Sequence, residues 1–368
     1  MADSSTATGL RVTQWDDKFF TEYLGGNRFS AQMGTDENSI IQVKEDLTKK
    51  SGDRLNYALL NKLTNAAVTG SGTLEGNEED MTSRSHLLTV DKRRNAVRVA
   101  EMEEQKSAIS LRQGARAVLK DWAMEDTRSL IIRALNSMRA GTTISTWSTG
   151  AELLALNAVS DAWLTDNVDR ILFGAVALGT GVDFSTEHTK LDNTDDKMTA
   201  SVLMRAKIAA QLSAPRIRPI RTSGDEEWFV AYLHPYQVRD LVLSDTTFQA
   251  AHREARERSK ENPLFRGADY VWDGIIIREI PELPLVAAST AGSVIQTACA
   301  HLCGAQAVGY GLAKRWKSVE QTFDYGDKQG VAIEGIIGVE KLCFGTTAVD
   351  TDDLKQNGVV SIWTAAVA

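Results

Sequence analysis

Alternating apolar and polar positions predict two extended segments in the first hundred residues, at 53–62 and 87–100. A period of two is typical of half-buried strands, so we expect the two segments to form a β-hairpin. The alternating apolar residues are Leu55, Tyr57 and Leu59 in the first segment and Leu88, Val90 and Ala96 in the second.

The connection between these segments, 64–85, is rich in Asn, Thr, Ser and Gly. A structureless connection of about twenty residues is uncommon inside a compact domain and is usually functional or disordered. Two interpretations stay open: a loose surface loop, or an arm that reaches a neighbouring subunit. Few large apolar residues occur in it, so it is not expected to fold back onto its own core.

Helical periodicity follows the hairpin, from Ser107 to Arg139. Apolar residues recur there at steps of three, four or seven, the spacing of one helical face. Ser107 is a good N-cap type, and Gly141 follows as a stop signal. A continuous helix of this length spans roughly 50 Å. The apolar face does not keep a strict heptad, which argues against a coiled coil.

The rest of the chain predicts a mixture of helices and strands. We expect strands at 40–44, 227–234, 274–279 and 359–363, and an apolar segment of either type at 295–313. We expect helices at 15–29, 150–166, 195–213 (capped by Thr194) and 236–244 (opened by Pro235), and a loop at 174–193. All six prolines lie between Pro215 and Pro284. This suggests a boundary near 195–215 between a part of the chain without proline and a part that contains it.

Charge is distributed unevenly along the hairpin and suggests contacts between subunits. Its tip is acidic, its second strand is basic, and a mixed-charge run follows at 252–261. Complementary charges fix the register of a contact more than they add affinity. The candidate inter-subunit residues are Leu74, Glu75, Glu78, Glu79 and Asp80 at the tip, Lys92, Arg93, Arg94 and Arg98 on the strand, and Arg253, Arg256 and Glu257 in the run.

Composition is that of an ordinary globular protein, with 368 residues, 43% hydrophobic and 24% charged. The net charge of −8 argues against a protein held on nucleic acid by counterion release. Three cysteines do not make a disulfide framework, so a reducing compartment is expected. The first residues lack the pattern of a signal peptide. The uncharged stretch 283–313 contains much Ala, Gly, Ser and Thr, so it predicts buried core and not a membrane span.

Catalytic and cofactor motifs do not emerge. Phosphate-loop, dinucleotide and serine-hydrolase signatures are absent from the sequence. Cys299, His301 and Cys303 lie close together but lack zinc spacing and a fourth nearby ligand, which favours small buried side chains. His234 ends a strand without a nucleophile nearby, so a structural histidine is favoured over a hydrolase centre. No enzyme, cofactor or metal is therefore expected.

Several stretches in one order resemble the N-four-like family of tailed-bacteriophage major capsid proteins, which have the Hong Kong 97-like fold. They include Trp15–Tyr23, Asn38–Asp53, Leu74–Glu79, Asn262–Gly267 with Asp273–Ile277, Leu302–Gln306, and Asp324–Gly326 with Gly330–Ala332. The resemblance implies an α+β fold with these segments: an N-terminal arm at 1–46, an extended loop at 47–100, a peripheral domain with a long spine helix at 101–194, an axial domain at 195–315, a return to the peripheral domain at 316–345 and a C-terminal tail at 346–368.

The resemblance also implies a function: self-assembly into hexamers and pentamers of an icosahedral head around double-stranded DNA, with no membrane. Expected partners are further copies, a separate scaffolding protein, a portal, a possible decoration protein, and DNA bound without sequence specificity. The expected location is the virion, assembled in the host bacterial cytoplasm. An encapsulin-like cellular compartment shell is the alternative within the same fold.

Overall fold

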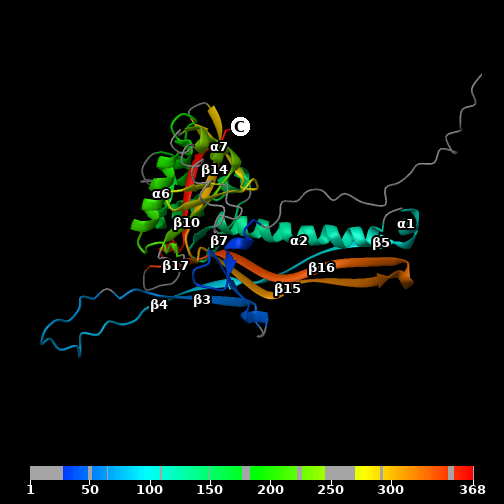
Figure 1. Ribbon diagram of the computed structural model, residues 1–368, viewed down its shortest axis with the longest axis horizontal. Helices are drawn as coiled ribbons and strands as arrows, with labels where there is room; N and C mark the ends of the chain where they lie inside the picture. The colour runs from blue at the N-terminus through cyan, green and yellow to red at the C-terminus, as the bar shows by residue number, and fades with distance from the viewer. Residues whose placement is uncertain are drawn as a thin grey trace, which may run out of the picture. The chain divides into compact units, whose positions relative to one another are not determined.

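The computed structural model describes residues 28–48, 52–63, 65–107, 110–147, 149–175, 183–221, 226–244, 270–290, 293–346 and 352–367 (Figure 1). They form two compact units. Unit 1 contains Lys92–Thr127 and Lys314–Ile336, and unit 2 contains Arg28–Asp91, Arg128–Ala313 and Ile337–Ala368. The predicted six-segment division stays a prediction.

The fold mixes helices and strands, as predicted. The helices are α1 (Glu101–Lys106), α2 (Leu111–Leu135), α3 (Gly150–Leu154), α4 (Asn157–Asp166), α5 (Phe184–Thr189), α6 (Ala200–Leu212) and α7 (Pro235–Ser244).

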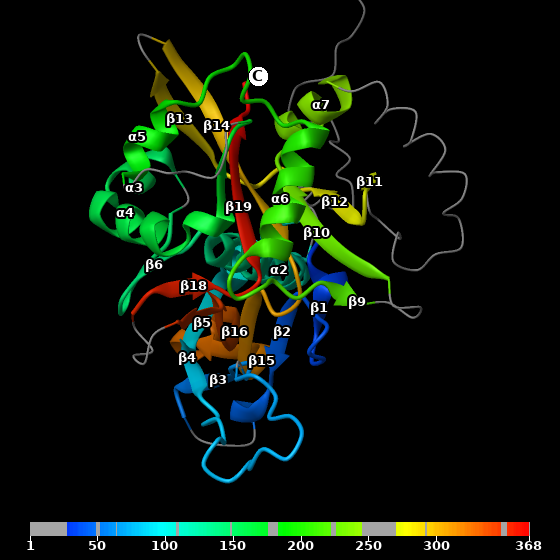
Figure 2. The ribbon, with the colours of Figure 1, turned by 90° about the vertical axis from the view of Figure 1, so that its left-hand side faces the viewer.

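An eight-stranded sheet organises the core of unit 2, in the order β11-β12-β10-β14-β19-β8, with β13 on β14 and β9 on β10. Its strands are β8 (Ile171–Phe173), β9 (Ile220–Arg221), β10 (Glu227–Leu233), β11 (Tyr270–Trp272), β12 (Ile275–Glu279), β13 (Leu285–Thr290), β14 (Ser293–Cys303) and β19 (Val359–Ala365). Helices α6 and α7 cover one face (Figure 2). There Leu203 and Ala206 pack on Phe229 and Ile277. Because these strands are buried on both faces, they read as continuous apolar runs.

A second sheet has the order β1-β2-β15-β16-β5, and three two-stranded ladders pair β3 with β4, β6 with β7, and β17 with β18. The strands are β1 (Met33–Gly34), β2 (Ile41–Lys44), β3 (Arg54–Leu60), β4 (Ser83–Thr89), β5 (Asp91–Ala100), β6 (Met138–Ala140), β7 (Thr143–Ser145), β15 (Val308–Phe323), β16 (Lys328–Lys341), β17 (Cys343–Gly345) and β18 (Leu354–Gln356). The uncharged stretch 283–313 forms β13, β14 and the start of β15. Most of its described side chains are buried, as predicted.

The prediction of one strand from Leu87 to Ala100 is wrong. The chain leaves the hairpin after Thr89, passes Val90, and enters the five-stranded sheet as β5. The hairpin's second strand begins earlier, at Ser83, which pairs with Leu60. The alternation of apolar and polar residues continues through Val90. Periodicity therefore could not show that the residues before Val90 and those after it pair with different strands.

The prediction of one helix from Ser107 to Arg139 is too long at both ends. Ser107 instead ends α1, and the Ser110 hydroxyl accepts from Gln113 N after it. At the other end, the Ser137 hydroxyl donates to Ala134 O at 2.7 Å, a local bond that competes with helix continuation. Met138 kept the helical spacing but belongs to β6.

Three further boundaries differ from prediction. The helix at 150–166 is two helices, α3 and α4. The loop at 174–193 contains α5, whose N-cap Asp183 accepts from Thr186 N. The helix predicted from Asp195 begins at Ala200, capped by Thr199 and not Thr194. The predictions of β2, β10, β12, β19 and α7 are confirmed to within a residue or two. The predicted helix at 15–29 lies almost entirely outside the described residues.

Candidate assembly surface

The β3–β4 hairpin is anchored at its base by side chains that fit closely into unit 2. Leu55, Tyr57 and Leu88 are buried. The Tyr57 hydroxyl lies 3.2 Å from Gln42 O and 3.3 Å from Tyr310 O, and burial raises its pKa well above the usual value. A side chain at Gly311 would meet Leu55 and Leu88 at 2.7 Å. The base is therefore a rigid support for what lies beyond it.

Beyond Leu60 the hairpin continues as an extended connection, and its described residues up to Thr82 form no helix or strand (Figure 1). We call residues 61–82 the arm. Its large apolar side chains face solvent: Leu74 is 64% exposed and Met81 is 70% exposed. These exposed apolar side chains make the arm a candidate contact surface.

The acidic tip of the arm is locally ordered. Asn77 N donates to Leu74 O at 3.0 Å, across a turn in which Gly76 has a φ of +85°. Glu78 Oε2 accepts from Gly76 N at 2.7 Å, and Glu79 Oε2 accepts from Asn65 N at 2.8 Å. Glu78 thus stabilises the turn, and Glu79 joins the two sides of the arm. Glu75 and Asp80 have no ion-pair partner among the residues that the structure describes.

The basic strand β5 lies in unit 1, and its four predicted cations divide into two kinds. Lys92 pairs with Glu334 at 2.9 Å, and Arg93 pairs with Asp126 of α2. Together with Lys314, Lys92 lowers the pKa of Glu334 to about 2. Arg94 and Arg98 are exposed, and no carboxylate in the described chain pairs with them. Sequence reasoning missed the internal partners because nothing near them in sequence indicates the pairing.

Arg253, Arg256 and Glu257 lie outside the described residues, so their predicted role stays a prediction.

Helix α2 packs on the β15–β16 hairpin within unit 1. Leu119 and Ala123 contact Val331 and Ile333, with Trp122 and Trp316 at their edge. The Trp316 indole donates to Thr127 Oγ1 at 3.3 Å. The Glu320 carboxylate forms ion pairs with both Arg112 and Arg116 of α2. The helix face predicted from periodicity is only partly buried, since Val118 is 53% exposed and lines an apolar groove with Val97 and Leu111.

A buried histidine that sequence reasoning missed lies at the arm's base. Arg139 Nη1 lies 2.7 Å from His86 Nδ1, and His86 Nε2 faces Glu340 Oε2 at 3.3 Å. The chain Arg139–His86–Glu340 connects β6, β4 and β16 inside unit 2. No motif in the sequence could have indicated it.

The cysteines and His301 are core side chains, as predicted. Burial raises the pKa of the Cys299 thiol to about 12, and burial lowers the pKa of His301 to about 3. His301 Nε2 lies 2.7 Å from Asn136 Oδ1. His234 Nδ1 accepts from Tyr236 N, a structural contact. Within the described ranges, no cluster of three or more His, Cys, Asp or Glu side chains could hold a metal ion. No helix among the same residues is long and apolar enough to span a membrane.

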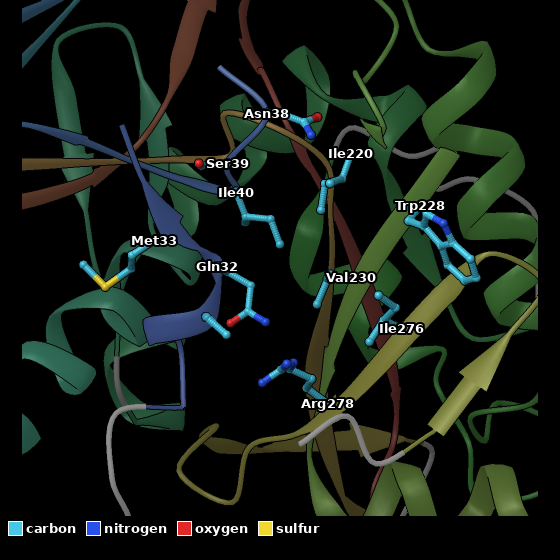
Figure 3. A pocket seen from close by; sticks show the side chains of 11 residues that line it. Gln32, Met33, Asn38, Ser39, Ile40, Ile220, Trp228, Val230, Ile276 and Arg278 are labelled. Carbon is cyan, nitrogen blue, oxygen red and sulfur yellow. The ribbon is translucent and has the colours of Figure 1, made fainter. Parts of the chain in front are cut away.

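A cavity of about 330 Å³ lies in unit 2 between residues 31–40 and one face of the large sheet (Figure 3). Ile40, Val230 and Ile276 line it, Trp228 lies at one side, and Arg278 points toward Gln32 at its lower rim. Sequence reasoning placed no site here. The one signal was a single arginine at the end of the apolar run Ile275–Ile277.

Comparison with known proteins gives consistent results over nearly the whole chain. A family model described as phage capsid protein matches residues 4–368. A major capsid protein of Pseudomonas phage KPP25 is 26% identical and aligns over 98% of this chain and 96% of that protein.

Solved structures agree with this fold. The capsid of cyanophage Pam1 superposes with a TM-score of 0.82 at 30% identity, with both chains fully covered. The capsid of Ralstonia phage GP4 gives 0.78 at 24% identity, covering 100% of this chain and 99% of that one. These capsid chains have the Hong Kong 97-like fold, as predicted, and the matches do not favour the compartment-shell alternative. The chain therefore belongs to the phage capsid protein family.

Proposed function

We propose that this protein is the major subunit of an icosahedral phage head, forming hexamers and pentamers that enclose double-stranded DNA. Family membership supports the capsid role. The single observation that carries the mechanism is the arm, whose apolar residues are exposed while its base is tightly anchored. In the assembled shell, the arm of one copy lies on strand β5 of the next copy.

Charge supports this pairing. The tip carries the carboxylates of Glu75 and Asp80, and β5 carries the guanidinium groups of Arg94 and Arg98. None of these four side chains has an ion-pair partner among the described residues. At 0.15 M salt the screening length is about 8 Å, so only contacting charges interact strongly. We infer that these pairs set the register of the arm, while Leu74 and Met81 supply the buried apolar area.

The arm's role is tested by replacing residues 65–80 with a short Gly-Ser turn. This deletion keeps Asn61 bonded to Thr82 and leaves β3 and β4 complete. A deletion of Asn65–Arg84, as the sequence alone would suggest, would also remove Arg84, which pairs with Leu59. The shortened chain should remain a folded subunit by circular dichroism. It should fail to form closed shells by electron microscopy and sedimentation. Normal shells would disprove the role.

The partner surface is tested by charge reversal. The double variants E75R/D80R and R94E/R98E should each reduce shell formation, and their combination in one chain should restore it. The isosteric variant E75Q/D80N is the matched control, because it removes charge without reversing it and should cause a smaller loss. If both reversals block assembly and the combined chain does not recover, the arm binds a surface other than β5.

Five further features stay predictions: a separate scaffolding protein, a portal, a decoration protein, assembly in the host cytoplasm, and the absence of catalysis.

A further inference from the structure

The cavity of unit 2 contains a buried cation, Arg278, for which the described residues supply no counter-ion. Arg278 is 8% exposed. With the amide oxygen of Gln32 turned toward it, its Nε and Nη2 donate to that oxygen at 2.9 and 3.0 Å, and its Nη1 lies 3.4 Å from the backbone oxygen of Arg28. Among the described residues, no carboxylate lies within ion-pairing distance of Arg278. Buried charges are normally paired, because removing an ion from water is costly.

A second arginine, Arg28, comes close to Arg278 through its backbone oxygen. Arg28 Nη1 donates to Glu279 O at 2.7 Å, another neutral acceptor, and the described chain offers this guanidinium no carboxylate either. Both guanidinium groups are therefore bonded to neutral oxygens, whereas a guanidinium pairs most strongly with an anion.

Two other polar side chains of the lining, Asn38 and Trp228, are already hydrogen-bonded. The Asn38 amide exchanges both its hydrogen bonds with the Arg221 backbone, and the Trp228 indole donates to Glu226 Oε2 at 3.2 Å. Most of the lining is apolar: Ile40, Ile220, Val230 and Ile276, with the ring of Trp228. One charged end and an apolar body therefore describe the complementary molecule.

We propose that this cavity binds a small carboxylate with an aliphatic stem. The carboxylate takes the place of the Gln32 amide oxygen on Nε and Nη2 of Arg278, and the stem lies between Ile40 and Ile276. A cavity of about 330 Å³ is at the lower end of small-molecule sites and suits a stem of about eight carbons. A phosphate dianion fits less well, because no lysine lines the cavity and its walls are mostly apolar.

The site is tested with octanoate labelled with ¹³C at its carboxyl carbon, titrated into the full-length protein and followed by NMR. Octanoate should bind with a Kd of about 0.1–1 mM, and octan-1-ol, which lacks the charge, should bind at least about tenfold more weakly. R278Q should weaken octanoate binding by about tenfold or more. I276W should abolish it, because the indole fills the cavity while Arg278 remains. R205Q removes an exposed arginine of α6, on the other face of the sheet, and should leave binding unchanged.

The comparison of head groups uses the unaltered protein, so it decides the question even if R278Q does not fold. Equal binding of octanoate and octan-1-ol, or no binding of octanoate, would overturn the proposal. Octanoate should bind both unassembled subunits and closed shells. Binding to subunits alone would mean that an acidic side chain of another copy fills the cavity in the shell, which would also overturn it. The test is independent of the arm and of its partner surface.

Discussion

Arg93 of β5 and Asp126 of α2 form two parallel bonds, from Nε to Oδ2 at 2.5 Å and from Nη2 to Oδ1 at 2.6 Å. This geometry joins the strand to the helix within unit 1. R93A should therefore lower the free energy of unfolding of unassembled subunits by about 1–2 kcal/mol, since charge-assisted paired bonds exceed ordinary surface ion pairs. Urea denaturation followed by circular dichroism measures it.

The neighbouring R94A is the matched control, because Arg94 has no described partner. It should change the free energy of unfolding by less than about 0.5 kcal/mol. Equal losses for the two variants would mean that Arg93 contributes through chain propensity and not through Asp126.

Gly335 of β16 lies directly against the Trp316 ring, and a methyl group there would come within 3.0 Å of two ring atoms. The ring has little freedom to move, because it also packs on Trp122 with centroids 5.9 Å apart. G335A should therefore destabilise the subunit by about 1–3 kcal/mol, the usual cost of overpacking a filled core. A change in tryptophan fluorescence of the native state should accompany the loss. Unchanged stability would show that the sheet moves away from the ring easily.

Gly114 offers the opposite case within the same unit. It is the fourth residue of α2, and a methyl group there would meet no atom within 4 Å. G114A should raise the free energy of unfolding by about 1 kcal/mol, because alanine loses less backbone freedom in a helix. Thermal melting of subunits is a sufficient measurement. A loss of stability would indicate that the helix bends at Gly114.

These cases show how far the sequence specifies the fold. Strands with a clear period, such as β3, and apolar runs, such as β10, were predictable because burial of one or both faces fixes the pattern. The exit of the chain from the hairpin at Val90 was not predictable. The partner of β5 is β16, which lies far away in the sequence. The site divides in the same way. The exposed arm could be predicted from its lack of apolar residues, whereas Asp126 beside Arg93 and Gln32 beside Arg278 required the tertiary structure.

Acid should destabilise the subunit through its buried histidines. Burial, with a further effect of nearby Lys341, lowers the pKa of His301 to about 3, and burial lowers that of His188 to about 4. The ordinary value is about 6.5, so below that pH the unfolded chain takes up protons that the folded chain does not. Stability is fully present above about pH 6.5 and is lost as pH falls toward the folded pKa values.

The slope should approach about 1.4 kcal/mol per pH unit for each histidine between pH 6 and pH 4. H301Q removes one titrating group and keeps a donor for Asn136, so its stability should fall less steeply with acid by about that amount. Parallel curves for the two proteins would contradict the assignment of His301 as a neutral buried side chain.

The start of α6 distinguishes two threonines that the sequence alone assigns wrongly. The Thr199 hydroxyl accepts from Val202 N at 3.3 Å, whereas exposed Thr194 is held only through its backbone, by Asp192 Oδ1 at 2.7 Å. Because an N-cap oxygen satisfies an otherwise unpaired amide, T199A should cost about 0.5–2 kcal/mol of unfolding free energy. T199S keeps the hydroxyl and should recover most of the loss. T194A should change stability by less than about 0.5 kcal/mol. If T194A proved the more damaging substitution, the helix would begin at Asp195 in solution, as the sequence predicts.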